Sequence, residues 1–226
     1  MLIYDRVTKK MRGVRLPLNG SPQEVMYRDP SVSDDGRVIA FSQFSMKRSP
    51  HSKPSVWIFI YDRVTGCTAE LPQTRPAADF AGNPSISGDG RYVAFDCSGG
   101  VFMYDRQTHV TRPVTPLWDG VETSNRYGSA CVSRDGKYIA YSSSAIRRTH
   151  DDCRYVGNVF VRNLVTREPT KVAGPHYQSI GRPSISANGR YLAFQLEETY
   201  DRRSGIYICD TQTGHTTKIW GEGLRR

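Results

Sequence analysis

The sequence predicts an all-β fold of repeated four-stranded antiparallel sheets, because one motif occurs four times along its 226 residues. The clearest copy is "NPSISGDGRYVAF", from Asn83 to Phe95. The copies align on the glycine of an Asx-Gly pair, with spacings of 54, 46 and 53 residues. Such a period indicates that one supersecondary unit is stacked repeatedly, in a ring or in a line.

Each repeat begins with a short strand, a tight turn and a second strand. In the clearest copy "SIS" is followed by Asp89-Gly90 and then by "RYVAF". We expect a two-residue type I′ turn, which requires positive φ at both central residues and favours Asx-Gly. Strands joined this closely pair antiparallel. We assign a structural role to the turn residues Asp35, Gly36, Asp89, Gly90, Asp135, Gly136, Asn188 and Gly189.

The second strand of each repeat is apolar throughout, as in "VIAF", "YVAF", "YIAY" and "YLAF". A continuous apolar run, in place of alternation, predicts a strand that is buried on both faces of its sheet. Alanine recurs at the same register in all four copies, followed each time by Phe or Tyr. We expect the small side chain to admit the neighbouring sheet, while the aromatic ring fills the space beyond.

The third and fourth strands form a second hairpin in each repeat. The copies are "WIFIYDRVTG", "GVFMYDRQTH", "NVFVRNLVTR" and "GIYICDTQTG", and a fifth example, "LIYDRVTKK", opens the chain. Carboxylates after the third strand are predicted to cap the turn through backbone hydrogen bonds. These residues are Asp62, Asp105 and Asp210. Four strands within 40 to 55 residues are typical of one blade of a β-propeller.

The combined motif P-S-x-S-x-D-G-R-x-x-A-F and I-Y-x-x-D-x-x-T-G resembles the WD40-like PD40 repeat of TolB-type β-propellers. This resemblance covers nearly the whole chain and implies blades stacked around a central channel. Similar repeats occur in periplasmic TolB, in propellers attached to prolyl-oligopeptidase-type hydrolases and in oligogalacturonate lyases. The resemblance therefore implies a fold and leaves the function open. It also implies a periplasmic or extracytoplasmic location, although "MLIYDRVTKKMRG" lacks the apolar core of a signal peptide.

We expect a single propeller domain over residues 1–226, with about five blades. A half-blade at 1–17 precedes four full blades at approximately 29–73, 83–115, 129–173 and 182–220. The half-blade leaves three possible closures: a five-bladed ring with an irregular first blade, a remnant of a longer propeller, or completion by another copy of the chain. We favour the five-bladed ring. Self-association through the incomplete blade is the third alternative, because exposed strand edges invite pairing.

The composition limits the classes of partner. The chain has 31 Lys and Arg against 22 Asp and Glu, a net charge of +9, which favours anionic partners. The basic residues are spread along the chain, so nucleic acid is not favoured as a partner. No apolar run reaches the length of about 18 residues that a membrane-spanning helix needs. The five cysteines lack C-x-x-C spacing and are expected to be structural thiols.

Catalytic motifs are missing from the sequence. It contains no G-x-S-x-G, P-loop or H-E-x-x-H pattern. Paired carboxylates can act as general acid and base, but Asn188 and Asn163 replace the repeated aspartates in the fourth copies, so a backbone role is favoured. The loop "THDDCR" contains possible zinc ligands, yet a solvated loop is favoured. We expect no catalytic residue, no cofactor and no metal, and we favour a protein that is not an enzyme.

Loops at one face of the predicted propeller carry the candidate binding residues. The connections between strands two and three, and those between successive blades, emerge at the same face. Aromatic and basic side chains there provide contact area and directional charge, although the aromatics can equally pack their own loops. The candidates are Trp118, Tyr127, Tyr27, His176, Tyr177, Arg147, Arg148, Lys47 and Arg48.

Two functions follow from these observations. The favoured hypothesis is a non-catalytic scaffold that binds a protein or peptide, possibly an acidic one, through its loop-rich face and channel mouth. The alternative is an enzyme or enzyme-associated propeller, polysaccharide lyase-like or peptidase-associated, acting on an acidic substrate. His176 is the natural candidate for lyase chemistry, but the sequence shows no companion histidines for it.

Overall fold

The computed structural model describes most of the chain, and every element of regular structure in that part is a β-strand. No described helix has the length and apolar character needed to cross a membrane. The prediction of an all-β fold with four-stranded antiparallel sheets is confirmed. The described residues are 2–14, 25–45, 55–72, 81–97, 100–115, 126–148, 153–177, 179–197 and 204–221.

The first two units contain six strands. Strands β1 (Leu2–Asp5) and β2 (Lys10–Gly13) form a hairpin that pairs with no other described strand. The next sheet has the order β3-β4-β5-β6, so each strand lies beside its neighbour in the chain. Its strands are β3 (Val25–Val32), β4 (Val38–Ser45), β5 (Ser55–Asp62) and β6 (Thr68–Glu70).

The other three sheets repeat this order. The third unit contains β7 (Ala81–Ile86), β8 (Tyr92–Cys97), β9 (Gly100–Asp105) and β10 (Val110–Pro113). The fourth contains β11 (Arg126–Val132), β12 (Tyr138–Arg148), β13 (Cys153–Asn163) and β14 (Pro169–Tyr177). The fifth contains β15 (Ser179–Ile180), β16 (Ser184–Ile185), β17 (Tyr191–Glu197), β18 (Gly205–Asp210) and β19 (Thr216–Gly221). Both β15 and β16 pair with β17.

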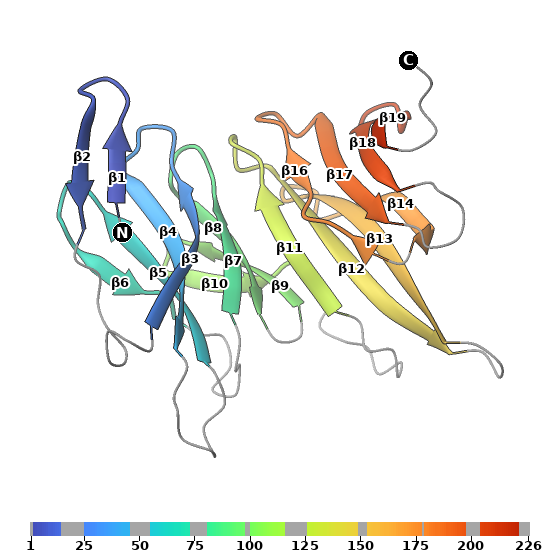
Figure 1. The fold of residues 1–226 in the computed structure, drawn as a ribbon, viewed down its shortest axis with the longest axis horizontal. Coiled ribbons are helices and arrows are strands. Elements are labelled where there is room, and N and C mark those ends of the chain that lie inside the picture. Colours follow the sequence, from blue (N-terminus) through green and yellow to red (C-terminus); the bar gives the residue numbers. More distant parts are fainter. Residues whose placement is uncertain are drawn as a thin grey trace.

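The five units follow one another in chain order, with β1–β2 at one end of the molecule and β18–β19 at the other (Figure 1). The hairpin does not lie beside the last sheet, so these two units do not close the expected five-bladed ring. Large apolar side chains are exposed at each end, Leu2 to 70% and Trp220 to 69%. Self-association through the incomplete first unit stays a prediction.

The predicted type I′ geometry of the Asx-Gly turns is wrong. Only the glycines have positive φ, between 66° and 75°, and their N–H groups donate to the serine carbonyl three residues earlier. This pattern is a type I turn followed by a left-handed glycine. The cause is the Asx side chain: Asp89 Oδ1 accepts hydrogen bonds from Arg91 N (2.9 Å) and Ser87 Oγ (2.6 Å). The same two bonds form at Asp35, Asp135 and Asn188.

The turn after the third strand is also capped by a side chain. Asp62 Oδ1 accepts the N–H of Val64 at 2.9 Å, two residues further on. Asp105 and Asp210 accept equivalent bonds from Gln107 and Gln212. Each aspartate is also paired with an arginine of the preceding hairpin, for example Arg91 Nη2 with Asp105 Oδ2 at 2.8 Å. These pairs join the two hairpins of one sheet at the edge that carries the turns.

In the second, third and fourth sheets the second strand is buried on both faces, as its apolar run predicts. In the fifth sheet the prediction is wrong, because burial alternates along β17 and Tyr191 is 46% exposed. In β8, Phe95 belongs to a core cluster with Ala40 and Ile58 of the preceding sheet. Ala94 belongs to another cluster, with Ala130 and Ile139 of the following sheet. The aromatic ring and the alanine therefore face opposite neighbours, and the third sheet buries both faces against the sheets beside it.

Candidate functional site

The first strand contains a bulge with a residue in the left-handed region in three of the four-stranded sheets. Asp29, Asn83 and Ser129 have φ of 52°, 52° and 54° and occupy the same place in three sheets. The strand register shifts at each of them. A non-glycine residue in this region is strained, so the surrounding structure must hold it there. In the fifth sheet the equivalent motif position carries Arg182.

A buried carboxyl group holds two of these bulges. Asp96, on β8, is 4% exposed. It accepts hydrogen bonds from Asn83 Nδ2 (2.7 Å), Ser129 N (2.7 Å) and Ala130 N (3.2 Å). Burial raises the pKa of Asp96, and the three donors oppose that effect. One side chain therefore fixes the inner strands of the third and fourth sheets relative to each other.

Side chains of the inner strands also bond to the backbone of the next sheet. Ser31 Oγ accepts a hydrogen bond from Ile86 N at 3.0 Å, and Ser85 Oγ accepts one from Val132 N at 3.1 Å. Cys131 occupies the equivalent place in the fourth sheet. Burial raises the pKa of its thiol to about 12, so the sulfur is protonated at neutral pH. The inner strands are thus tied together around a common axis.

The turns bridge one end of this axis. Asp34 N donates to Gly88 O (2.9 Å), Gly88 N to Arg134 O (2.8 Å) and Asp135 N to Ala187 O (3.1 Å). The Arg134 guanidinium also pairs with the Asp34 carboxylate. Glycine suits the place between them, because a Cβ added at Gly88 would lie 2.9 Å from the backbone oxygen of Arg134 as well as 2.5 Å from Asp34 Oδ2.

A pocket of about 210 Å³ lies between the inner strands of four sheets. Asp29, Ser31, Ser85, Ser129, Cys131 and Arg182 are among the residues that line it, and we call it the channel pocket. Arg182 Nη1 lies 3.2 Å from Asp29 Oδ1, and the two side chains are 54% and 30% exposed. The guanidinium keeps further N–H donors, which suit a carboxylate. The volume fits a single side chain.

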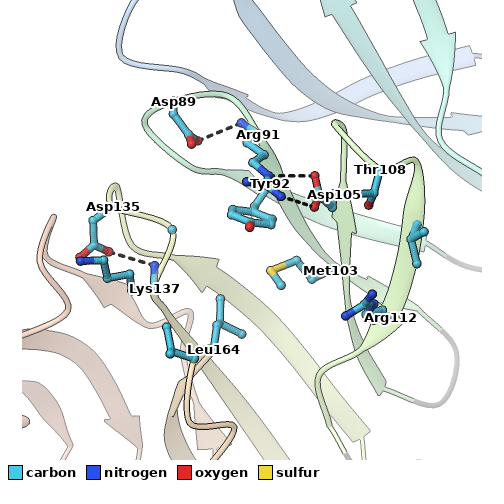
Figure 2. A pocket seen from close by; sticks show the side chains of 13 residues that line it. Asp89, Arg91, Tyr92, Met103, Asp105, Thr108, Arg112, Asp135, Lys137 and Leu164 are labelled. Carbon is cyan, nitrogen blue, oxygen red and sulfur yellow. Dashed lines mark hydrogen bonds and ion pairs between the residues drawn. The ribbon is translucent and has the colours of Figure 1, made fainter.

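A second pocket, of about 540 Å³, lies between the third and fourth sheets at the edge that carries the turns (Figure 2). We call it the turn-side groove. Its lining includes Asp89, Asp105 and Tyr92 from the third sheet, with Asp135 and Leu164 from the fourth. Arg91, paired with Asp105, lowers the pKa of that carboxyl to about 2. Asp105 therefore carries a full negative charge at neutral pH.

Most of the binding residues predicted from the sequence are not placed by the structure. Trp118, Lys47 and Arg48 lie outside the described residues. Tyr127, Arg147, Arg148, His176 and Tyr177 lie on described strands, but their side chains are outside the description. Their roles stay predictions.

Tyr27 is the one predicted binding residue whose side chain is described. Its ring lies edge-on to Phe41, with centroids 5.9 Å apart, and burial raises the pKa of its hydroxyl. It packs beside the core cluster of the second sheet. This contact favours a packing role for Tyr27 over an open binding position.

Sequence reasoning missed the residues of the channel pocket. Their signal is the repeated x-P-S segment, which is "DPS", "NPS" and "RPS" in three copies. The proline and serine recur while the first residue changes, and that first residue faces the pocket as Asp29 or Arg182. Among the described residues, no three His, Cys, Asp or Glu side chains gather as a possible metal site.

Comparisons with known proteins place the fold. No family model and no curated protein matches the sequence. Solved structures do match: an oligogalacturonate lyase in complex with manganese has a TM-score of 0.67 at 13% identity, covering 99% of this chain and 60% of that one. TolB from Agrobacterium tumefaciens has a TM-score of 0.60 at 16% sequence identity, covering 97% of this chain and 68% of that one. Dipeptidyl peptidase 4 from Porphyromonas gingivalis has a TM-score of 0.59 at 18% sequence identity, covering 85% of this chain and 32% of that one.

The fold is a β-propeller. The prediction made from the repeat is confirmed at this level, and TolB is among the similar structures. The chain spans about 60% of the length of the oligogalacturonate lyase. At these identities the likeness shows the fold alone.

Proposed function

We propose that this protein is a non-catalytic β-propeller scaffold that binds a protein or peptide through its loop-rich face and channel mouth. The observation that carries the proposal is the channel pocket, where inner strands of four sheets contribute polar side chains. A partner side chain entering this pocket meets the exposed guanidinium of Arg182. An acidic side chain fits best, because a guanidinium binds a carboxylate with two parallel hydrogen bonds.

The strained bulges support the same proposal. Left-handed conformations at non-glycine residues are concentrated at ligand sites, where the surrounding structure holds them in place. Here Asp29, Asn83 and Ser129 are all strained, and Asp29 and Ser129 line the pocket. The basic loop residues predicted from the sequence, Arg147 among them, would extend the attraction for an acidic segment beyond the pocket. The role of these loop residues is supported only by the sequence, because the side chain of Arg147 is outside the described part of the structure.

Replacing Arg182 by alanine is expected to weaken partner binding by about tenfold or more, the usual effect of losing a charged hydrogen bond. Partners are captured on the immobilised protein, and each is then titrated calorimetrically into wild type and Arg182→Ala. Arg190→Ala is the matched control, because Arg190 lies in the same sheet and pairs with Asp210 at the turn edge. Trp118→Ala and Arg147→Ala test the loops. Unchanged affinity of every captured partner for Arg182→Ala would remove the channel pocket from the function.

An enzyme acting on an acidic substrate is a second candidate. The similarity to an oligogalacturonate lyase in complex with manganese favours it, as does the arginine in the channel pocket. Elemental analysis of the purified protein, followed by a lyase assay on polygalacturonate, separates the two candidates. A stoichiometric transition metal together with eliminative cleavage would establish the enzyme. Without cleavage the scaffold proposal stands.

A further inference from the structure

The fourth sheet departs from the others at the turn-side groove. In three sheets the residue after the capping aspartate donates a side-chain hydrogen bond to the carbonyl of the turn glycine. In the fourth sheet this residue is Leu164, which has no donor, and no described residue donates to Gly136 O. The three bonded pairs are Arg63 with Gly36 (2.9 Å), Arg106 with Gly90 (2.7 Å) and Thr211 with Gly189 (2.9 Å).

Arg106 shows what the missing side chain does elsewhere. Its Nη1 bonds Gly90 O in its own sheet, and its Nη2 lies 3.9 Å from Asp62 Oδ2 of the preceding sheet. Asp62 is already paired with Arg37, at 3.0 Å. The Arg106 guanidinium therefore lies between a carbonyl and a carboxylate, across the junction of the second and third sheets.

The junction of the third and fourth sheets has the equivalent carbonyl and carboxylate, of Gly136 and Asp105, but no side chain equivalent to Arg106. Asp105 is the equivalent of Asp62 and is paired with Arg91 in the same way. Leu164 stands where Arg106 stands one sheet earlier, and the turn-side groove opens there (Figure 2). Asp89 and Asp135 also line it, each using only Oδ1 for its hydrogen bonds among the described residues.

Apolar groups and two cations complete the lining. Tyr92, Met103 and Leu164 provide surface for an aliphatic chain, as Figure 2 shows. Lys137 and Arg112 lie on opposite sides of the groove in that view, and neither pairs with a described carboxylate. Three carboxylates and three cations line the groove, so its net charge does not select a ligand. The selection comes from Gly136 O, to which no described residue donates, in the same groove as the Asp105 carboxylate.

We propose that the turn-side groove binds the guanidinium of an arginine residue from a partner peptide, in the place that Arg106 fills one junction earlier. The guanidinium donates to Gly136 O and forms an ion pair with the Asp105 carboxylate, as Arg106 does with Gly90 O and Asp62. The aliphatic stem of the ligand lies on Leu164 and Met103. Arginine is favoured over lysine because its planar fork reaches two acceptors at once. The groove lies at the opposite edge from the loop-rich face, so this site is separate from the channel pocket.

The binding test uses three peptides, acetyl-Gly-X-Gly-amide with arginine, lysine or citrulline as X. Each is titrated into 15N-labelled protein while the amide signals of Gly136, Lys137 and Leu164 are followed by NMR. The arginine peptide is expected to shift these signals with an affinity at least about tenfold above that of the citrulline peptide, which lacks the charge. Equal shifts with citrulline, or none with arginine, would overturn the proposal.

Variants identify the site independently. Leu164→Arg is expected to fill the groove from within and abolish the shifts, whereas the matched control Leu164→Met leaves the groove open and the shifts intact. Arg106→Leu is expected to open an equivalent groove at Gly90 and raise the stoichiometry from one to two. Lys137→Gln removes a repelling cation and is expected to strengthen binding. Weaker binding of the arginine peptide to Lys137→Gln would show that its guanidinium does not lie near this cation and would contradict the proposal, even if Leu164→Arg does not fold.

Discussion

Replacing Asp96 by alanine is expected to lower the free energy of unfolding by about 2–4 kcal/mol. The substitution leaves Asn83 Nδ2, Ser129 N and Ala130 N without their acceptor, in a place where water replaces it poorly. It also removes the contact that holds two residues in the left-handed region. Equilibrium unfolding in urea, followed by tryptophan fluorescence, measures the change.

Asp96→Asn is the matched control for this prediction. Asparagine keeps one acceptor oxygen, which can serve Asn83 Nδ2 and Ser129 N, but it loses the acceptor for Ala130 N. It has no charge to bury, so a smaller loss of stability than for alanine is expected. An alanine variant as stable as the wild type would show that Asp96 does not join the two sheets.

Replacing Ala94 by leucine is expected to cost about 1–3 kcal/mol, because overpacking forces side chains and backbone to move. Ala94 is 0% exposed and packs against Ala130 and Ile139 of the next sheet. A larger side chain there separates the third sheet from the fourth. Thermal and urea unfolding of the variant measure the cost.

Ala69→Leu is the control for Ala94, because Ala69 lies on β6 and is exposed. It adds the same atoms without opening a junction between sheets, and little change in stability is expected. Equal stability of Ala94→Leu and Ala69→Leu would contradict the close contact between neighbouring sheets.

The sheets were predictable from the sequence because the repeat encodes them directly. Apolar runs such as "YVAF" mark strands buried on both faces, and the Asx-Gly pairs mark the turns between strands. The turn type was not predictable from the dipeptide alone. Asp89 bonds both Ser87 Oγ and Arg91 N, and this local network selects type I geometry over the type I′ that Asx-Gly usually adopts in two-residue hairpins.

The channel pocket was harder to predict, because its geometry depends on contacts between sheets. Asp96 lies on the second strand of one sheet and bonds Ser129 in the next, 33 residues away. The groove had a visible signal, since "RNLVT" replaces "YDRVT" in the fourth repeat. Its meaning required the structure, because only there does Arg106 reach across to Asp62.

The arrangement of the units explains why the closed ring was wrongly favoured. The half-repeat at the start suggested closure against the last sheet, but β1–β2 and β18–β19 lie at opposite ends of the molecule (Figure 1). Counting repeats gives the number of units and does not give the angle between them. That angle follows from the side chains at each junction, such as Ala94 and Phe95.

Hydrogen exchange of the protein, alone and with a captured partner, tests most directly whether binding takes place at the channel pocket. Mass spectrometry reports the exchange of peptides that contain residues 28–31, 83–85, 129–131 and 181–184, the inner strands of four sheets. We predict slower exchange in these peptides when the partner is bound. Protection confined to other segments, with the inner strands unchanged, would contradict it.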